Sequence, residues 1–182
     1  MLVHLNNLDR HIPENTCKFI IAQIALAVKY MNDCNIVHRD LKDENIVIDS
    51  RYNLKLIDFG SASFIPTSRD KYFTKFNGTA HFASPEIVNG NSYRGPEAEI
   101  WSMGVLLFTI VCGENPFQNR KDILRGSFTY PTKINGDLSN LIDRMLHQNE
   151  KTRITIDQVL EHRWLKSEVD RLLDYYTRNS LL

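Results

Sequence analysis

Apolar residues recur at helical spacing near the start of the chain and again in its second half. The first series runs from Pro13 to Met31, and a proline near the start suits the first turn of a helix. Residues 100–112 are apolar nearly all round, which predicts a buried, central helix. Residues 138–146 form another amphipathic series, and residues 167–176 predict a last helix. Most of the chain is therefore expected to be helical.

Capping residues mark where two of the later helices should begin. Thr155 and Gln158 fit a capping box, in which each side chain bonds the backbone N–H of the other residue. A helix from there through Leu160 is expected. Ser167 is the expected N-cap of the last helix.

Short strand-like segments lie between the first two long helices. They are Ile36-Val37, residues 46–48 and residues 54–57. Residues 49–53 have turn composition, so the last two segments should pair as a hairpin. Residues 58–98 contain scattered Gly, Pro, Ser and Asn and are expected to be irregular. These patterns predict a fold that is mainly α with one small β element.

The composition is that of an ordinary globular domain and argues against several classes of partner. The 182 residues suffice for one domain with a sizeable core. The 22 basic and 22 acidic residues cancel, so no overall attraction to nucleic acid or to an anionic membrane is expected. The longest apolar run, Met103 to Cys112, is about half of what a membrane-spanning helix requires. We therefore expect neither nucleic acid nor a membrane as a partner.

The cysteines and the N-terminal residues bear on location. Cys17, Cys34 and Cys112 stand at wide spacings without a C-x-x-C pair, so neither a disulfide framework nor a zinc cluster is indicated. The first residues, MLVHLNNLDRH, lack the apolar core of a signal peptide. Reduced thiols in a cytoplasmic or nuclear protein are the expected state.

The stretch IVHRDLKDENIVI, residues 36–48, concentrates charge between two apolar segments. A carboxylate such as Asp40 can accept a proton from an attacking hydroxyl, and the ammonium of Lys42 can neutralise charge on a transferred phosphoryl group. The amide oxygen of Asn45 and the carboxylate of Asp58, in LIDFGSA, are ligands of the kind that Mg²⁺ takes. Each residue alone would be an ordinary polar residue of a turn. The argument for phosphate chemistry depends on their occurring together.

The order H-R-D-L-K-x-x-N, then D-F-G, then P-E resembles the signature of the eukaryotic protein kinases. The likeness continues in GTAHFASPE (78–86), EIWSMGVLLF (99–108) and TRIT (152–155). It covers residues 1–165 and implies the large, mainly helical lobe of a protein kinase. Residues 166–182 would form an amphipathic C-terminal helix or tail.

Two features narrow the resemblance within that family. Lys42, two residues after Asp40, is the form found in the serine/threonine class, and in that class the residue at Thr79 sits beside the catalytic Asp. Residues 91–117, which include YRGPEAEIWS, are similar to the PAS-domain-containing kinases, near the calmodulin-dependent kinase group.

The resemblance implies ATP and Mg²⁺ as cosubstrates and protein Ser or Thr hydroxyls as acceptors. Asp40 would then orient the substrate hydroxyl or accept its proton, and Lys42 would contact the γ-phosphate. Asn45 and Asp58 would hold Mg²⁺.

Further roles follow from the resemblance for the activation segment. Arg39 would face this segment and could pair with a phosphate on Thr67, Ser68 or Thr74. These hydroxyls could equally be ordinary polar residues of a loop.

Three more charged residues take roles from the resemblance. Glu86 would pair with Arg153 and tie the activation segment to the helical core. Glu44 would contact an Arg upstream of the target hydroxyl, which implies protein substrates with a basic motif. The alternative for Glu44 is an ordinary surface carboxylate.

The chain also departs from the family pattern. Ser84 stands where the family has Ala, and Glu99 stands where it has an Asp that braces the catalytic loop. The small β-rich lobe is expected to be absent, because no Gly precedes Gly60 and because Lys18 and Lys29 lie on a predicted helix. This chain alone is therefore expected to bind ATP weakly and to transfer phosphate poorly.

Three functions stay open. The first is a serine/threonine protein kinase, which the intact set of motif residues favours; these are Asp40, Lys42, Asn45 and Asp58. The second is a non-catalytic, kinase-like interaction or scaffold module (a pseudokinase), which the missing lobe favours. Its partner would be another kinase or a small lobe supplied in trans. The third, an unrelated helical Mg²⁺-dependent phosphotransferase with a roof from another chain, has no specific support.

Overall fold

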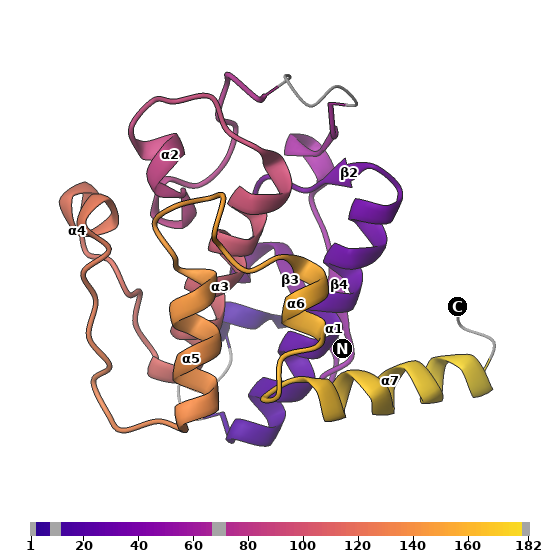
Figure 1. The fold of residues 1–182 in the computed structure, drawn as a ribbon. Coiled ribbons are helices and arrows are strands. Elements are labelled where there is room, and N and C mark those ends of the chain that lie inside the picture. Colours follow the sequence, from indigo (N-terminus) through magenta and orange to yellow (C-terminus); the bar gives the residue numbers. More distant parts are fainter. Residues whose placement is uncertain (1–2, 8–11, 67–71, 180–182) are drawn as a thin grey trace.

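Two helices, α1 (Glu14–Asp33) and α3 (Gly95–Cys112), form the centre of the fold (Figure 1). The computed structural model describes residues 3–7, 12–66 and 72–179. α1 packs against α3, and α3 packs in turn against α5 (Gly136–Met145). The predicted fold class, mainly α with a small β element, is confirmed.

α1 follows the predicted apolar spacing closely. Its buried side chains include Cys17, Ile20, Ile24 and Val28, which lie on one face at spacings of three or four residues. The helix starts directly after Pro13, and two backbone hydrogen bonds from Cys34 and Asn35 close its C-terminal end. The amphipathic pattern therefore places this helix against the core as expected.

α3 is buried on nearly all sides. Trp101, Met103 and Leu106 have no exposed surface, as the apolar sequence predicts. The helix begins at Gly95 rather than near residue 100. Pro96 suits this earlier start, because N–H groups in the first turn of a helix have no partner within the helix and proline has no N–H. Within the described part of the chain, α3 alone is long and apolar enough to cross a membrane, and 67% of it is buried inside the fold.

A three-stranded antiparallel sheet lies beside α1. Its order is β1 (Val3–His4), β3 (Ile46–Ile48) and β4 (Leu54–Leu56). The predicted hairpin is confirmed, with Ile46 paired to Leu56. β1 is an addition that the sequence did not predict, because two residues carry no periodicity.

The buried amide of Gln23 joins α1 to this sheet. Its nitrogen donates to the carbonyl of Tyr52 at 2.9 Å, and its oxygen accepts from the N–H of Leu54 at 3.2 Å. The side chain thus satisfies backbone groups at the turn of the hairpin and fixes the hairpin on the helix.

A second, two-stranded sheet carries the start of the polar loop. β2 (Ile36–Val37) pairs antiparallel with β5 (Ser63–Phe64). The described part of the chain also contains short 3₁₀ turns; they are Leu5–Asn7, Asp43–Asn45, Phe59–Ser61 and Ala80–Phe82. Residues 58–98 are therefore less irregular than predicted, since β5, two of these turns and α2 (Pro85–Val88) lie within them.

The structure differs from the sequence prediction at two of the later helices. α4 (Arg120–Arg125) was not predicted, although Asn119 caps it by accepting from the N–H groups of Lys121 and Asp122. The N-cap prediction for Ser167 is wrong, because α7 (Lys166–Arg178) begins one residue earlier. The capping box that starts α6 (Ile156–Leu160) is present as predicted.

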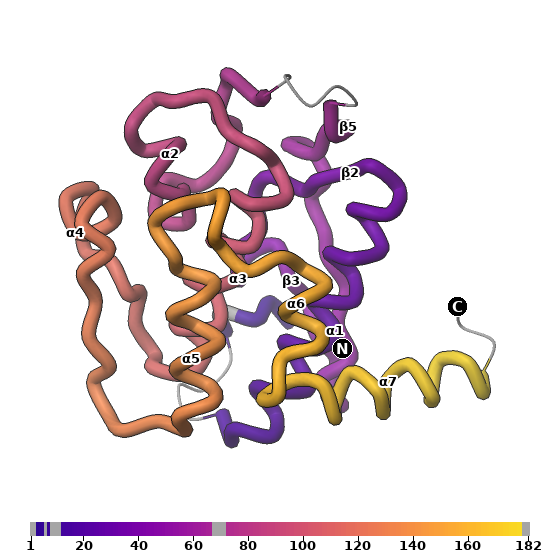
Figure 2. Tube along the Cα trace, in the orientation of Figure 1, coloured from indigo at the N-terminus to yellow at the C-terminus, as the bar shows by residue number. Residues whose placement is uncertain are grey.

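α7 lies across the base of the domain. It packs on α1 through Val169 and Leu172, and its C-terminal half extends past the rest of the domain in Figures 1 and 2. Just before α7, the indole N–H of Trp164 donates to a carboxylate oxygen of Glu14 at 2.9 Å. This bond ties the end of the chain to the start of α1.

Candidate active site

Asp40 lies in the loop after β2, with its carboxylate held by three neighbours. Oδ1 accepts from the backbone N–H and from the hydroxyl of Thr79, both at 2.8 Å. Oδ2 accepts from the amide nitrogen of Asn45 at 3.1 Å and lies 3.4 Å from Nζ of Lys42. The carboxylate is therefore oriented from both sides.

The charge state of Asp40 follows from these contacts. Burial works against ionisation, but the Thr79 hydrogen bonds and the Lys42 ammonium outweigh it, so the pKa of Asp40 lies below its usual value. A carboxylate that stays charged accepts a hydrogen bond from a substrate hydroxyl and orients it.

Lys42 bridges Asp40 and Glu44. Its Nζ lies 3.0 Å from Glu44 and donates to the Thr79 hydroxyl at 2.8 Å. Partial burial lowers the pKa of Lys42, but the neighbouring carboxylates outweigh this, so its pKa is raised overall. The ammonium thus stays charged beside the carboxylate of Asp40. Glu44 is exposed, and its carboxylate forms an ion pair with Lys42.

Asn45 and Asp58 lie at neighbouring ends of β3 and β4. The N–H of Ile57 donates to the carbonyl of Asn45 at 2.9 Å, which places Asp58 one residue beyond this pairing. The amide nitrogen of Asn45 is turned to Asp40, so its Oδ1 is the atom left for a cation. Asp58 is exposed and uses Oδ1 to accept from the N–H of Gly60. An amide oxygen and a carboxylate are ligands of the kind that Mg²⁺ takes.

Asp58 and Arg39 both have left-handed backbone conformations, with φ of 59° and 65°. Side chains with a Cβ adopt this region at a cost, and residues in it cluster at functional sites. Here Arg39 directly precedes Asp40, and Asp58 itself bears the second carboxylate of the site. The conformation turns the backbone sharply at both places.

The side chain of Arg39 faces the predicted activation segment. Its Nε donates to the carbonyl of Ser61 at 2.7 Å, and its Cζ lies 4.9 Å from the centre of the Phe73 ring. Thr74 is exposed next to Phe73, whereas Thr67 and Ser68 lie outside the described residues. The phosphate-binding role of Arg39 stays a prediction.

Glu99 holds the backbone of the loop that precedes Asp40. Its Oε1 accepts from the backbone N–H groups of His38 and Arg39, at 2.7 and 3.3 Å. The side chain of Glu99 is buried, and burial raises its pKa to about 7 against the effect of these two hydrogen bonds. Glu99 therefore makes, with its longer side chain, the bonds to the loop backbone that the family pattern implies for an Asp at this position.

His38 is a site residue to which the sequence analysis assigned no separate role. It is fully buried, its Nε2 bonds the carbonyl of Ile57 at 3.1 Å, and its ring lies edge-on to Phe59, with the centres 4.9 Å apart. Burial lowers the pKa of His38, so the ring stays neutral. It links the loop of Asp40 to the strand that leads to Asp58.

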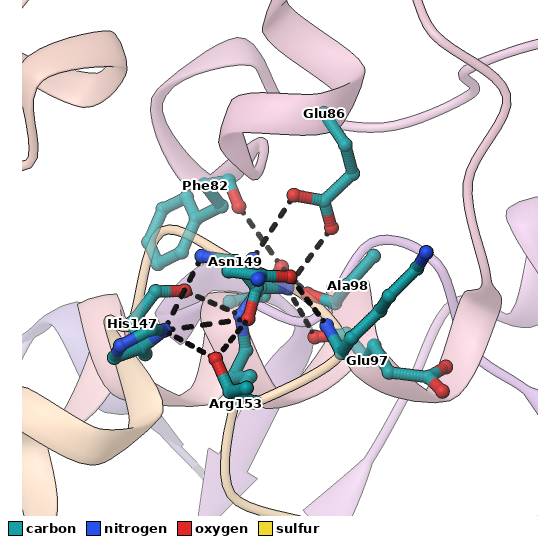
Figure 3. Close-up of polar contacts among 10 residues, drawn as sticks. Phe82, Glu86, Glu97, Ala98, His147, Asn149 and Arg153 are labelled. Carbon is teal, nitrogen blue, oxygen red and sulfur yellow. Dashed lines mark hydrogen bonds and ion pairs between the residues drawn. The ribbon is translucent and has the colours of Figure 1, made fainter.

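Glu86 and Arg153 form a buried ion pair (Figure 3). Figure 3 shows Arg153 reaching from the loop before α6 toward Glu86 on α2. The guanidinium also donates to the carbonyl oxygens of Glu97 and His147, at 2.7 and 3.0 Å. These bonds connect α2, α3 and the loop after α5.

An apolar cavity opens directly after Thr79. Its volume is about 280 Å³. Its lining includes Phe76, Ala80, Ala83, Ile87 and Phe117. Because Thr79 bonds Asp40, the lining of this cavity includes the residue directly after a partner of that carboxylate.

Comparison with known proteins gives one family. The profile of the protein kinase domain matches residues 2–165 of the chain. This range includes every residue of the site described above.

Several curated relatives agree with this match. Serine/threonine-protein kinase ppk6 of Schizosaccharomyces pombe is 43% identical over 153 residues, which are 84% of this chain and 19% of that protein. Serine/threonine-protein kinase PSK2 of Saccharomyces cerevisiae is 41% identical over 155 residues, 84% of this chain and 14% of that protein. The PAS domain-containing serine/threonine-protein kinase of Mus musculus is 38% identical over 165 residues, 90% of this chain and 12% of that protein. The predicted likeness to PAS-domain-containing kinases is confirmed, and the chain spans less than 20% of the length of these relatives.

Proposed function

The chain belongs to the protein kinase family, and from this premise we propose that it carries the catalytic centre of a serine/threonine protein kinase. The reaction would transfer the γ-phosphate of ATP to a Ser or Thr hydroxyl of a protein. The observation that carries the proposal is the arrangement of Asp40, Lys42 and Thr79, joined by hydrogen bonds of 2.8 Å.

Asp40 receives the substrate hydroxyl in this proposal. Its ionised carboxylate accepts a hydrogen bond from the incoming hydroxyl and takes up the proton as the oxygen attacks phosphorus. Lys42, held beside it, offsets the negative charge that develops on the transferred group. The Thr79 hydroxyl links the two side chains and keeps their separation fixed.

Asn45 and Asp58 would hold Mg²⁺ with the phosphates of ATP. Their donor oxygens fit this ion, which neutralises phosphate charge when bound. The described residues include no glycine-rich strand and loop to cover the nucleotide. We therefore expect the 182-residue chain on its own to transfer phosphate poorly.

Two surfaces would select the protein substrate. Glu44, exposed beside Lys42, would meet a basic side chain upstream of the acceptor hydroxyl. The apolar cavity after Thr79 would take an apolar side chain downstream of it. A peptide library that shows no preference for basic residues upstream would contradict the role of Glu44.

A binding module without catalysis is the second candidate function. Phe59 and Phe64 are 51% and 74% exposed near the site, and such apolar surface suits a partner. This partner would be another kinase or a small lobe supplied in trans.

The test compares Asp40→Asn with Asp33→Asn in the full protein as its gene encodes it. Both substitutions remove one carboxylate charge, but Asp33 lies at the exposed end of α1. Phosphate transfer from ATP to a Ser/Thr peptide library should fall at least 100-fold in Asp40→Asn and stay unchanged in Asp33→Asn. Equal phosphate transfer by both variants would overturn the role of Asp40, and no transfer by the wild-type protein would overturn the kinase proposal and favour the binding module.

A further inference from the structure

Phe73 and Tyr93 join the segment after Asp58 to the start of α3. Their backbones exchange two N–H···O bonds, of 2.9 and 3.0 Å, and their ring centres lie 5.5 Å apart. Tyr93 is 2% exposed, and its hydroxyl donates to the carbonyl of Lys75 at 3.2 Å. Tyr93 therefore gives Phe73 a fixed place on the helical core.

The side chain of Arg39 packs on the Phe73 ring. The guanidinium carbon lies 4.9 Å from the ring centre, within the range of a cation–π contact. A second contact holds the same side chain: Nε of Arg39 donates to the Ser61 carbonyl at 2.7 Å. The preceding residue, Tyr72, makes the same kind of contact with Arg94, whose Cζ lies 5.3 Å from the centre of the Tyr72 ring.

Gly95, at the start of α3, leaves room for the Phe73 ring. A Cβ atom on Gly95 would lie 2.8 Å from Cε2 of Phe73 and 2.8 Å from Cγ2 of Val37. Such separations are too short for carbon atoms, so only glycine at this position lets the ring lie where it contacts Arg39. The first turn of α3 is thus shaped around Phe73.

The backbone of Arg39 needs support because it is left-handed, with φ of 65°. That conformation is disfavoured for a residue with a Cβ, and it sets the direction in which the chain enters Asp40. Glu99 holds the N–H side of Arg39, at 3.3 Å. Phe73 and Ser61 hold the far end of its side chain.

Given the proposed kinase function, we propose that Phe73 is a positioning residue, which sets the Asp40 carboxylate by holding the side chain of Arg39. Phe73 touches neither the substrate hydroxyl nor the phosphate in this scheme. Its effect reaches Asp40 through one residue, so it should change turnover more than substrate binding.

The experiment uses Phe73→Leu and Phe73→Tyr in the full protein as its gene encodes it. Leucine keeps apolar bulk and removes the ring face, whereas tyrosine keeps the face. Phe128→Leu is the matched control, because Phe128 is also half-buried against aromatic rings but lies away from Arg39. Turnover is measured on the best peptide of a Ser/Thr library, and amide hydrogen exchange is followed over residues 36–42.

We expect kcat to fall about tenfold in Phe73→Leu, with the KM for ATP little changed. Exchange over residues 36–42 should quicken in Phe73→Leu, and Phe73→Tyr should restore both quantities. In Arg39→Met, the further change Phe73→Leu should have little additional effect, because both act through one contact. Unchanged turnover and exchange in Phe73→Leu, or equal losses in Phe128→Leu, would overturn the proposal.

Hydrogen exchange separates this inference from the proposed function. If the wild-type protein transfers no phosphate and Phe73→Leu still quickens exchange over residues 36–42, the contact stands and the kinase proposal fails. If the wild-type protein is active and neither quantity responds to Phe73→Leu, the kinase proposal stands and this inference fails.

Discussion

Arg153 and Glu86 meet in a two-point ion pair, with Nη1 on Oε1 at 2.9 Å and Nη2 on Oε2 at 3.0 Å. The Arg153 side chain has no exposed surface and lies over the Trp101 ring, at 5.2 Å. Each of its three nitrogens donates to an acceptor on α2, α3 or the loop after α5. The pair therefore fixes the end of the segment that bears Thr79 on the helical core.

Removing the guanidinium should destabilise the fold strongly. Arg153→Met leaves the Glu86 carboxylate, whose side chain is 10% exposed, without its partner. We expect the free energy of unfolding to fall by about 3–5 kcal/mol, measured by urea denaturation. Arg163→Met is the control, because the ion pair of Arg163 with Asp137 is 72% exposed on the arginine side and should contribute about 1 kcal/mol or less. Similar losses in both variants would contradict this account of Arg153.

The contact between α3 and α5 depends on Gly104. A Cβ there would lie 2.9 Å from Cβ of Met145 and 2.9 Å from Cδ2 of Leu146. We expect Gly104→Ala to be destabilising, since overpacking costs about 1–3 kcal/mol and the better helix propensity of alanine returns about 1. Gly136→Ala serves as the control, because a Cβ at Gly136 meets nothing within 4 Å. A melting temperature of Gly104→Ala equal to that of the control would show that the helices can separate without cost.

The sequence predicted those parts of the fold that periodicity alone specifies. α1, α3 and α5 repeat apolar residues over two or more turns, and the capping box of α6 is a local signal. β1 and β5 have two residues each, so only their partners β3 and β2 make them strands. The capping signal of Asn119 was present before α4 but the helix has only six residues.

The same division applies to the site. The order of Asp40, Lys42, Asn45 and Asp58 along the chain was enough to assign them to one centre. No sequence rule joins Phe73 to Tyr93, because twenty residues and an irregular segment separate them. Gly95 was a possible signal, since a glycine in the first turn of an apolar helix points to a close neighbour.

Glu99 should make stability depend on pH. Its pKa is raised to about 7 in the folded protein, so the folded state keeps a proton that the unfolded state loses above about pH 4.5. The stabilisation is present below pH 4.5 and is lost as the pH rises through about 7, a change of about 3 kcal/mol. The groups that face its carboxylate are the backbone N–H groups of His38 and Arg39, which do not titrate in this range.

The measurement compares the wild-type protein with Glu99→Gln between pH 4.5 and 8. The amide oxygen of glutamine can still accept from the two N–H groups, but it does not titrate. We expect the free energy of unfolding of the wild-type protein to fall over this range relative to that of Glu99→Gln. Parallel curves for the two proteins would mean that Glu99 titrates normally in the folded state.

Thr79 should matter for turnover through its hydroxyl. That hydroxyl donates to Asp40 and accepts from Lys42, both at 2.8 Å, whereas its backbone N–H makes a separate bond to Asp40. Thr79→Val keeps the shape and the N–H bond but removes the link between the two charged groups. A hydrogen bond to a charged group contributes about 1.5–3 kcal/mol, so kcat should fall about ten- to hundredfold.

Two comparisons make the Thr79 prediction specific. Thr79→Ser retains the hydroxyl and should keep most of the turnover. Thr109→Val removes a hydroxyl that donates to the Val105 carbonyl within α3, at 2.9 Å, and should leave kcat unchanged. If Thr79→Val turns over as fast as Thr79→Ser, then Asp40 and Lys42 hold their positions without the bridging hydroxyl, and the backbone N–H of Thr79 is sufficient to orient the carboxylate.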